Sequence, residues 1–393
     1  MSLLSLPLGY VPLVDAAPLI LAEALGFAAE EGLELHLRPS PSWASLRDML
    51  AAGQVVAAQM LAPLPVASAL GLGGSTAQFE ALMVLNVNGD TIGVSQALAA
   101  RIRAAGHRFD FRDAGAAGQA LLPAAGDQLR IGVPFPFSMH MELIRYWLDG
   151  LGLPLPAMLD IRTVPPPRMA EALAAGEIDA FCVGEPWGSV AVDAGAGSLL
   201  LPGSAIWAFA PEKVLATRRG WAEAEPALAG RLMRAVWRAG RWLGQAANAS
   251  VASELLAVPG RLAVPAEVIE RALTGRVLIS ARGEERRSPG LITFHAGAAN
   301  FPWRSQAAWI GARLARRHGL APEPAIAAAR AVFRSDLYRL HLAQAGAELP
   351  SASDKVEGSL ADPTPAPSVQ GRLILAPDRF FDARVFDPDE PMR

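Results

Sequence analysis

Five residues at predicted strand ends, turns and helix starts could together form a ligand site: Trp43, Asp90, His140, Gly184 and Lys213. Lys213 would supply positive charge, and His140 would supply a hydrogen-bond donor together with the free N–H groups of a helix start. The indole ring of Trp43 would supply a flat apolar face. A small planar oxyanion presents acceptors around its edge and a face for packing, so these groups indicate an anion-binding site.

The same residues do not form the pairs that catalysis would need. No nucleophile is matched with a base, the six histidines show no metal-ligand spacing, and the sequence has no P-loop and no GxGxxG motif after the first predicted strand. The single cysteine, Cys182, excludes an internal disulfide and falls in a predicted core strand, where packing is favoured over chemistry. The pattern therefore favours a binding protein over an enzyme, with no cofactor and no metal.

An internal repeat predicts how these residues are positioned. Residues 173–186, LAAGEIDAFCVGEP, match residues 50–63, LAAGQVVAAQMLAP, at a constant offset of 123 positions. In each copy a helical pattern rich in alanine and leucine ends at a glycine, and a short apolar strand follows. Two dipeptides that end earlier predicted strands keep the same offset, Leu8-Gly9 and Ile131-Gly132.

Two copies of strand–loop–helix–strand–helix–strand predict an α/β protein with two lobes, each a mainly parallel sheet flanked by helices. Ligands of open α/β sheets bind beyond the carboxyl ends of the strands, next to helix N-termini. We therefore expect the five residues to converge on a cleft between the lobes. The predicted organisation is the first part of lobe 1 (1–88), lobe 2 (89–205), the return to lobe 1 with a helical part (206–350), and a linker with a docking C-terminal tail (351–393).

The two copies of the repeat differ at the ends of their predicted strands. Residues 61–63 of the first copy are the apolar run Leu-Ala-Pro, whereas Gly184 and Glu185 of the second copy offer a free backbone amide and a carboxylate. We therefore expect the backbone contact with the ligand to come from Gly184, opposite Trp43 of the first lobe.

Each of the five residues also has an interpretation without a ligand. Trp43 could anchor the core, Asp90 could be a turn residue, and His140 could simply open a helix. Gly184 could serve only the backbone conformation before a proline, and Lys213 could form a solvated surface pair with the adjacent glutamate. Two more residues are expected to be structural: Trp187 in core packing and Asp15 as a helix cap.

Composition narrows the class of protein further. The chain has 393 residues, of which 52% are hydrophobic and 19% charged, as in globular proteins of two or three domains. Its net charge of −3 lacks the excess of basic residues that direct nucleic-acid binding would need. No apolar run is long enough to predict a membrane span. Residues 1–7 show no basic start of a secretory signal, which predicts a cytoplasmic protein. A trimmed start would look the same, so a periplasmic location stays open.

Eight segments follow one another along the chain: LGYVPLVDAAPLILAEALGF (8–27), SWASLRD (42–48), LNVNGD (85–90), MHMELIRYWL (139–148), VPPPRM (164–169), DAFCVGEPW (179–187), PEKV (211–214) and FFDARVFDPDEP in the tail. Together they resemble the nitrate/bicarbonate-binding proteins of ABC importers, the NrtA/CmpA-type family. The resemblance implies a periplasmic-binding-protein-like fold of type II with two lobes and two crossings. In the nitrate branch a tryptophan, a side-chain amide, a histidine, a backbone glycine and a lysine hold the ligand. In the matching motifs of this sequence, the resemblance places these five groups at the five residues named above.

Asp90 departs from the family pattern, which has glutamine or asparagine at this position. An ionised carboxylate facing an anion lowers affinity unless it is protonated or paired with Lys213 or His140. The lysine favours nitrate or nitrite over bicarbonate, whose branch resembles a carboxylate-plus-calcium arrangement at this place. A shift of one residue in the match would put Glu212 in place of Lys213, so the assignment of the lysine stays open.

The start of the chain departs from the secreted members and resembles the cytoplasmic NasS-type nitrate/nitrite sensors. These hold an RNA-binding antiterminator of the NasT type and release it when the ligand binds. The first expectation is therefore a non-enzymatic cytoplasmic nitrate/nitrite sensor. One alternative is the substrate-binding component of a nitrate-type ABC importer, which would work with a permease and an ATPase. Another is an enzyme of the same fold, such as a thiamine-pyrimidine synthase, which would need a catalytic cysteine or histidine in the cleft.

Overall fold

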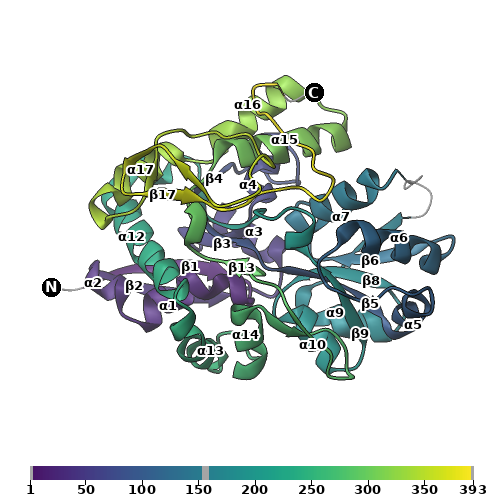
Figure 1. Ribbon diagram of the computed structural model, residues 1–393. Helices are drawn as coiled ribbons and strands as arrows, with labels where there is room; N and C mark the ends of the chain where they lie inside the picture. Colours follow the sequence, from purple (N-terminus) through teal and green to yellow (C-terminus); the bar gives the residue numbers. More distant parts are fainter. Residues whose placement is uncertain (1–2, 153–158, 391–393) are drawn as a thin grey trace.

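A computed structural model describes residues 3–152 and 159–390 of the chain (Figure 1). Two mainly parallel sheets lie side by side in it, each flanked by helices, so the two-lobed α/β fold predicted above is confirmed. Within the described ranges, no helix is long and apolar enough to cross a membrane.

The first lobe is built on a six-stranded sheet. Its strands β1, β2 and β3 are parallel, and β10 inserts antiparallel between β3 and β4. The order across the sheet is β13-β4-β10-β3-β1-β2. The strands are β1 (Leu4–Tyr10), β2 (Leu33–Pro39), β3 (Ala57–Leu61), β4 (Phe79–Asn88), β10 (Pro211–Arg218) and β13 (Ile292–Thr293).

The second lobe is built on a five-stranded sheet of order β7-β6-β8-β5-β9. Here β6 is parallel to β7 and β8, and β5 inserts antiparallel between β8 and β9. In both sheets, therefore, the fourth strand from the β2 or β7 edge runs against its neighbours. The strands are β5 (Asp90–Ser95), β6 (Leu129–Val133), β7 (Leu159–Thr163), β8 (Ala180–Gly184) and β9 (Gly197–Pro202).

Helices cover both sheets. Helices α1, α12 and α13 bury one face of the first sheet, while α3, α4 and α15 pack in the core cluster on its other face, which continues into the second lobe. The helices are α1 (Ala17–Ala24), α2 (Phe27–Glu30), α3 (Trp43–Ala51), α4 (Pro63–Ala69), α5 (Gln96–Ala104), α6 (Ala114–Ala125), α7 (Met139–Gly150), α9 (Met169–Ala174), α10 (Trp187–Asp193), α11 (Trp221–Ala224), α12 (Pro226–Leu243), α13 (Ala249–Ala257), α14 (Ala266–Thr274), α15 (Arg304–His318), α16 (Pro322–Val332) and α17 (Ser335–Leu342).

The structure reproduces the repeat in its strand register. Leu8 pairs with Ala57 between β1 and β3, and Ile131 pairs with Ala180 between β6 and β8, so both pairs keep the 123-residue offset. Gly9 lies so close to helix α3 that a Cβ there would stand 2.4 Å from a Leu46 methyl carbon. Its counterpart Gly132 makes the same close approach to α9, where a Cβ would stand 2.8 Å from a methionine sulfur. The repeated glycines thus allow helix and sheet to pack closely.

Two segments carry the chain between the sheets. The first is Gly89, which separates β4 from β5 and has a φ of 114°, a conformation that favours glycine. The second lies between β9 and β10 and contains the short 3-10 helix η3 (Gly203–Ala205). Because of these crossings, β5 enters the second sheet and β10 returns to the first at equivalent places.

Local sequence sets where two of these elements begin. The apolar strand of the second repeat copy begins at Ala180, and residues 221–243 are divided between the helices α11 and α12. The division falls at Pro226, the first residue of α12, because proline is suited to a helix start and has no N–H to continue the preceding helix.

The C-terminal residues pack against the body of the protein. The segment 351–371, whose composition predicts a linker, contains two short strands and the buried Glu357. Phe380 stacks on Trp207 of the return crossing, with ring centroids 4.8 Å apart, and on Trp309 of α15 at 5.9 Å. The domain boundaries proposed from the sequence stay a prediction. The remaining strands are β11 (Arg276–Leu278), β12 (Glu285–Arg287), β14 (Leu349–Pro350), β15 (Thr364–Ala366), β16 (Ser368–Gln370) and β17 (Leu373–Leu375).

Candidate functional site

The five residues singled out in the sequence lie together where the two sheets meet. Asp90 is the first residue of β5 and pairs in register with Gly184, the last residue of β8. Lys213, near the start of β10, pairs with Leu61 at the end of β3. Trp43 is the first residue of α3. Strand ends and a helix start from both lobes thus converge on one place.

Helix capping places Trp43 and His140 at this junction. The Ser42 hydroxyl caps α3 by accepting a hydrogen bond from the backbone N–H of Ser45 at 3.2 Å. Ser138 caps α7 in the same way through the N–H of Met141, also at 3.2 Å, and His140 is the second residue of that helix. The caps fix where each helix begins, and so fix which side chain of its first turn reaches the site.

The distances show how closely the groups approach. His140 Nε2 lies 3.2 Å from an oxygen of Asp90, and His140 Nδ1 lies 3.4 Å from an oxygen of Glu212. The Lys213 ammonium stands 5.3 Å from the centre of the Trp43 ring. All of these side chains are buried. At Gly184 a Cβ would stand 2.8 Å from a Leu13 methyl carbon and 3.8 Å from His140 Nε2, so the glycine lets the backbone lie close to these residues.

The structure excludes one alternative for Lys213 and overturns one expectation for Asp15. Lys213 does pair with the adjacent Glu212, but both side chains are buried, so the alternative of a solvated surface pair does not hold. Asp15 does not cap a helix. It lies in the 3-10 helix η1 (Val14–Ala16), and its carboxyl forms an ion pair with Lys213 at 2.8 Å and accepts a hydrogen bond from Gln59. A buried ammonium is a stronger partner for a carboxylate than a backbone N–H, which explains the difference.

Trp187 and Cys182 behave as the sequence indicates. Trp187 is partly buried, packs against the cores of both faces, and donates a hydrogen bond from its indole N–H to the Pro12 carbonyl at 3.0 Å. Cys182 is a free, fully buried thiol in β8. Burial raises the pKa of this thiol well above its usual value, which disfavours the reactive thiolate.

Gln59 was missed in the sequence, although it completes the site. It lies in the buried strand β3, where its side-chain carbonyl accepts a hydrogen bond from the Val11 N–H at 2.8 Å and its amide donates to Asp15. One signal could have found it, because an amide in the middle of the apolar run Ala-Ala-Gln-Met-Leu must find partners when buried. No comparable local signal separates Asp15 or Glu212 from ordinary surface carboxylates.

The electrostatics of the site centre on Lys213. Burial opposes its charge, yet the carboxylates of Asp15, Glu212 and Asp90 raise the pKa of this lysine above its ordinary value, so the ammonium stays charged. Burial, together with the positive charge of Lys213, lowers the pKa of His140 well below its ordinary value. The histidine is therefore neutral near pH 7, with one ring nitrogen that donates and one that accepts.

The carboxyl groups hold their protons more tightly than exposed ones do. Burial and then the nearby Glu212 carboxylate raise the pKa of Asp90 well above its ordinary value. Burial also raises the pKa values of Glu212 and Asp15, although Lys213 acts against it in both cases. Three acids thus surround one ammonium and one neutral imidazole, and a proton on Asp90 relieves the excess of negative charge.

Several polar atoms of the site have no hydrogen-bond partner of suitable geometry within the described part of the chain. They are both carboxyl oxygens of Asp90, both ring nitrogens of His140, one oxygen of Glu212 and the indole nitrogen of Trp43. Buried polar groups are normally satisfied, so such a group of unpaired donors and acceptors is typical of a ligand site. Both donors and acceptors are present, as binding a small polar molecule would require.

A metal ion is one conceivable occupant. Among the residues that the structure describes, Asp90, His140 and Glu212 each offer a ligand atom, and these atoms lie within 4.8 Å of one another. Carboxylate and imidazole ligands suit several divalent cations. The ammonium of Lys213, however, already pairs with Glu212 and would repel a second cation at close range. The donor set therefore fits a cation by type, and the three acids attract one, while the adjacent Lys213 ammonium opposes it.

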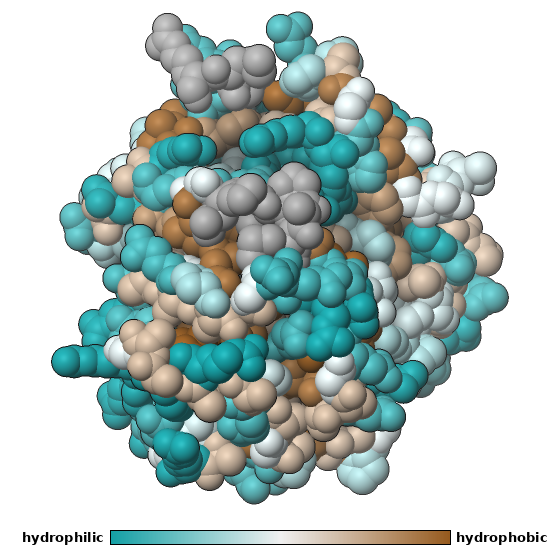
Figure 2. Space-filling model, turned by 90° about the vertical axis from the view of Figure 1, so that its right-hand side faces the viewer, coloured by the Kyte–Doolittle hydropathy of each residue, from teal (hydrophilic) through white to brown (hydrophobic). Residues whose placement is uncertain are grey.

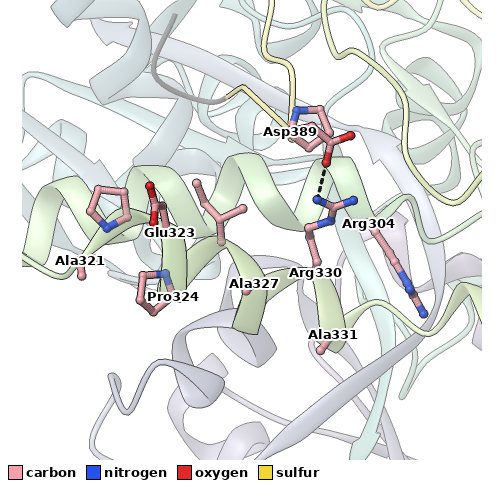
Figure 3. Close-up of a pocket in the computed structure, with 11 residues that line it drawn as sticks. Arg304, Ala321, Glu323, Pro324, Ala327, Arg330, Ala331 and Asp389 are labelled. Atoms are coloured by element: carbon pink, nitrogen blue, oxygen red, sulfur yellow. Dashed lines mark hydrogen bonds and ion pairs between the residues drawn. The ribbon is translucent and has the colours of Figure 1, made fainter.

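A cavity of about 800 Å³ lies apart from these residues, between α16 and the chain segment around Pro388 and Asp389 (Figure 3). Its charged groups are partly engaged with one another, since Arg330 pairs with Asp389 at 2.8 Å and with Asp354 at 3.0 Å. It shares no residue with the cluster around Lys213. The buried unpaired groups, rather than cavity size, therefore identify the candidate site.

Comparison with known proteins identifies the family. A family model described as the NMT1-like family matches residues 3–257. The chain belongs to the NMT1-like family. This NMT1-like chain is also 29% identical to the nitrate/nitrite binding protein NrtA of Synechococcus elongatus over 98% of its own length and 84% of that protein. The predicted resemblance to the NrtA type is thereby confirmed.

Other relatives of this NMT1-like protein are longer transport proteins. It is 33% identical to the nitrate import ATP-binding protein NrtC of Synechocystis over 80% of its own length, and 33% identical to the bicarbonate transport ATP-binding protein CmpC of Synechococcus elongatus over 79%. The NMT1-like chain spans about half the length of these ATP-binding relatives, 46% and 45% respectively.

Solved structures support the fold of this NMT1-like chain. The crystal structure of the periplasmic nitrate-binding protein NrtA from Synechocystis matches it with a TM-score of 0.84 and 26% identity, over 99% of this chain and 97% of that one. A ligand-binding component of an ABC-type import system from Staphylococcus aureus matches with a TM-score of 0.65 at 18% identity, over 86% and 98%, which supports the fold alone. The predicted periplasmic-binding-protein-like architecture is confirmed.

Proposed function

We propose that the chain binds nitrate or nitrite at the junction of its two lobes and does not transform it. The observation that carries this proposal is the buried ammonium of Lys213 beside the Trp43 ring, with His140 and Gly184 on the facing lobe. The ammonium neutralises an anion, the indole packs against a planar face, and the neutral imidazole donates one hydrogen bond. The similarity to NrtA over nearly the whole chain favours nitrate and nitrite as the anions.

Asp90 takes part as a protonated carboxyl in this proposal. A carboxylic acid has one O–H, so it donates a hydrogen bond to an anion as the N–H of a side-chain amide would. The surroundings of Asp90 favour this form, because it is buried beside a second carboxyl, that of Glu212. With aspartate in place of the family's amide, anion binding is then retained but depends on pH.

The role of binding has two versions, and both depend on a change in the arrangement of the lobes when the ligand enters. In the first, the protein is a cytoplasmic sensor that holds an RNA-binding antiterminator and releases it when nitrate or nitrite binds. In the second, it is the substrate-binding component of an ABC importer and works with a permease and an ATPase. The names of the ATP-binding relatives, NrtC and CmpC, favour the second version.

An enzymatic role of the same fold is the remaining alternative, and the chemistry of the site does not favour it. The only thiol of the chain, Cys182, is fully buried and its raised pKa opposes ionisation. His140 lies between carboxyl groups and has no hydroxyl or thiol beside it in the contacts above. These surroundings therefore suit His140 as a ligand-binding residue better than as part of a catalytic pair.

Titration calorimetry tests the binding step. We expect nitrate or nitrite to bind, and Lys213→Gln to weaken that binding by a hundredfold or more, about 3 kcal/mol, because a charge-assisted contact is lost. Arg287→Gln is the control, since Arg287 is exposed on β12, away from the site. Equal affinity in the Lys213 variant and the control would remove Lys213 from the site.

Affinity purification distinguishes the two roles. The tagged protein is recovered from cells grown with and without nitrate, and the co-purifying proteins are identified by mass spectrometry. An RNA-binding partner that is lost on addition of nitrate supports the sensor, whereas permease or ATPase subunits support the importer component.

A further inference from the structure

Four arginines line a second, smaller cavity on the far side of helix α7. Arg145 belongs to α7, and the other three come from the last two turns of α15: Arg313, Arg316 and Arg317. The cavity has a volume of about 230 Å³ and also contains the carboxyls of Glu142 and Asp149. We call these four arginines with their cavity the arginine pocket.

Two of the arginines are already neutralised by the two acids. Arg317 pairs with the buried Glu142 at 2.8 Å, and Arg313 pairs with Asp149 at 3.4 Å. Arg145 and Arg316 have no carboxylate within ion-pair distance among the described residues. The arginine pocket therefore has an excess of two positive charges. The side of the molecule on which α6 and α7 lie carries dense groups of hydrophilic side chains (Figure 2).

Two of the four guanidinium groups, those of Arg313 and Arg317, are held in place by aromatic rings or backbone. Arg313 lies 5.4 Å from the centre of the Tyr146 ring and 5.8 Å from that of Trp309. Arg317 lies 5.5 Å from the Phe137 ring and donates to the Pro136 carbonyl at 3.0 Å. Stacking of this kind orders the side chains before a ligand arrives, which lowers the entropy cost of binding.

Burial adds an independent sign of a missing partner. The Nε atoms of Arg145 and Arg313 are buried and make no hydrogen bond to any described residue. Burial, opposed by Glu142 and reinforced by Arg145 and Arg313, lowers the pKa of Arg317 below its ordinary value. Cations that crowd one another in this way are stabilised by an anion between them.

We propose that the arginine pocket binds a phosphate group, as inorganic phosphate or as the terminal phosphate of a small metabolite. Guanidinium groups contact phosphate through two parallel N–H···O bonds, which suits a site formed by several arginines. The volume lies below the ~300 Å³ at which pockets for drug-sized ligands begin, so one phosphate group fits and a whole large ligand does not.

Such a ligand would connect the two lobes. Helix α7 belongs to lobe 2 and carries His140 in its first turn, while α15 packs on α4 of lobe 1. A phosphate held by arginines of both helices would stabilise the arrangement in which His140 faces Lys213. By thermodynamic reciprocity, phosphate and the ligand of the main site would each increase the affinity for the other. This coupling rests on the proposed function, whereas phosphate binding itself does not.

The direct test titrates inorganic phosphate, and then pyrophosphate, into the full chain by calorimetry at low salt. We expect the wild-type protein and the exposed-arginine control Arg282→Gln to bind, and the double variant Arg145→Gln/Arg316→Gln to bind at least tenfold more weakly. The double variant should bind nitrate without phosphate as the wild type does, which places the phosphate outside the main site. Absence of binding to the wild-type protein, or equal binding by the double variant, would overturn the proposal.

The coupling is tested by titrating nitrate with and without saturating phosphate. We expect nitrate affinity to rise several-fold with phosphate in the wild type and to stay constant in the double variant. A constant affinity in both proteins would overturn the coupling while leaving the phosphate site in place. If nitrate does not bind under any condition, the proposed function fails, and the phosphate titration still decides the arginine pocket on its own.

Discussion

Asp90 and Lys213 occupy equivalent positions in the two sheets, one acidic and one basic. Asp90 pairs with Gly184, and Lys213 pairs with Leu61. Gly184 and Leu61 are themselves counterparts in the 123-residue repeat. Asp90 and Lys213 therefore each lie on the antiparallel strand, β5 or β10, that crosses from the other lobe. The repeat has placed an acidic and a basic group at the two points where the chain crosses, and each group shifts the pKa of the other.

Replacing Asp90 with asparagine tests the role of this carboxyl. We expect Asp90→Asn to tighten nitrate binding by about tenfold near pH 7.5, ~1.4 kcal/mol, because an amide donates a hydrogen bond without first taking up a proton. Titration calorimetry measures the change, with the exposed Arg287→Gln as control. A loss of affinity would instead show that the Asp90 carboxyl helps to build the site.

The affinity of the wild-type protein should depend on pH. Anion binding favours protonated Asp90, whose pKa is already raised by burial and by Glu212, so affinity is highest below that pKa and falls as pH rises through it. The groups facing it are His140 and Glu212, with Lys213 and Asp15 beyond them. Calorimetry in buffers of different ionisation enthalpy should show proton uptake on binding. Proton uptake that persists in Asp90→Asn would assign the proton to another group.

Removing the ammonium should destabilise the fold. Lys213→Met leaves the buried Asp15 and Glu212 without their cation, which costs about 3–5 kcal/mol when one partner of a buried pair is lost. The folded state then holds protons on these acids more tightly than the unfolded state does. The loss of stability should therefore be small at low pH and grow as pH rises. Urea unfolding at several pH values measures it, and a loss independent of pH would contradict the electrostatic explanation.

Chelation should leave nitrate binding unchanged. Asp90, His140 and Glu212 could hold a divalent cation by geometry, but the Lys213 ammonium is already paired with Glu212. We expect equal nitrate affinity with EDTA and with added calcium, and no rise in melting temperature when calcium is added. A rise that Glu212→Gln abolishes would show that a cation enters the site.

Phe380 provides a test of the tail. Its ring is buried against both Trp207 and Trp309, so Phe380→Ala should destabilise the protein by about 3–5 kcal/mol, as for other buried phenylalanines. Val385, exposed in the same segment, provides the control Val385→Ala, which should change stability little. Equal effects of the two changes in urea unfolding would mean that the tail contributes no specific packing.

The repeat made much of the fold predictable. Local periodicity predicts the strands, the shared offset predicts that β1–β3 and β6–β8 pair alike, and the order of elements predicts two sheets. The convergence of Trp43, Asp90 and Lys213 follows from the same reasoning, since strand ends and helix starts meet at one edge. Their role in binding stays a prediction until it is measured.

Other features depended on contacts between distant segments. Asp15 has the local pattern of a helix cap, and only the return of β10 beside β3 brings Lys213 to it. The arginine pocket likewise depends on α7 and α15, which lie far apart in the sequence. A buried side chain is decided by its spatial neighbours, so spacing along the chain did not reveal these pairs.

The docked tail makes the two crossings mechanically unequal. At the first, Gly89 alone joins β4 to β5. At the second, backbone hydrogen bonds of 2.9 Å join Ala208 to Arg379 and Phe381 to Ile206, in addition to the stacking of Phe380 on Trp207. The tail therefore fastens the second crossing directly, and the first crossing is tied to the second through Asn88, which bonds to Ala208 and Ala210. A tail that holds the second crossing thus also limits, through Asn88, how far the first can change when one lobe moves against the other.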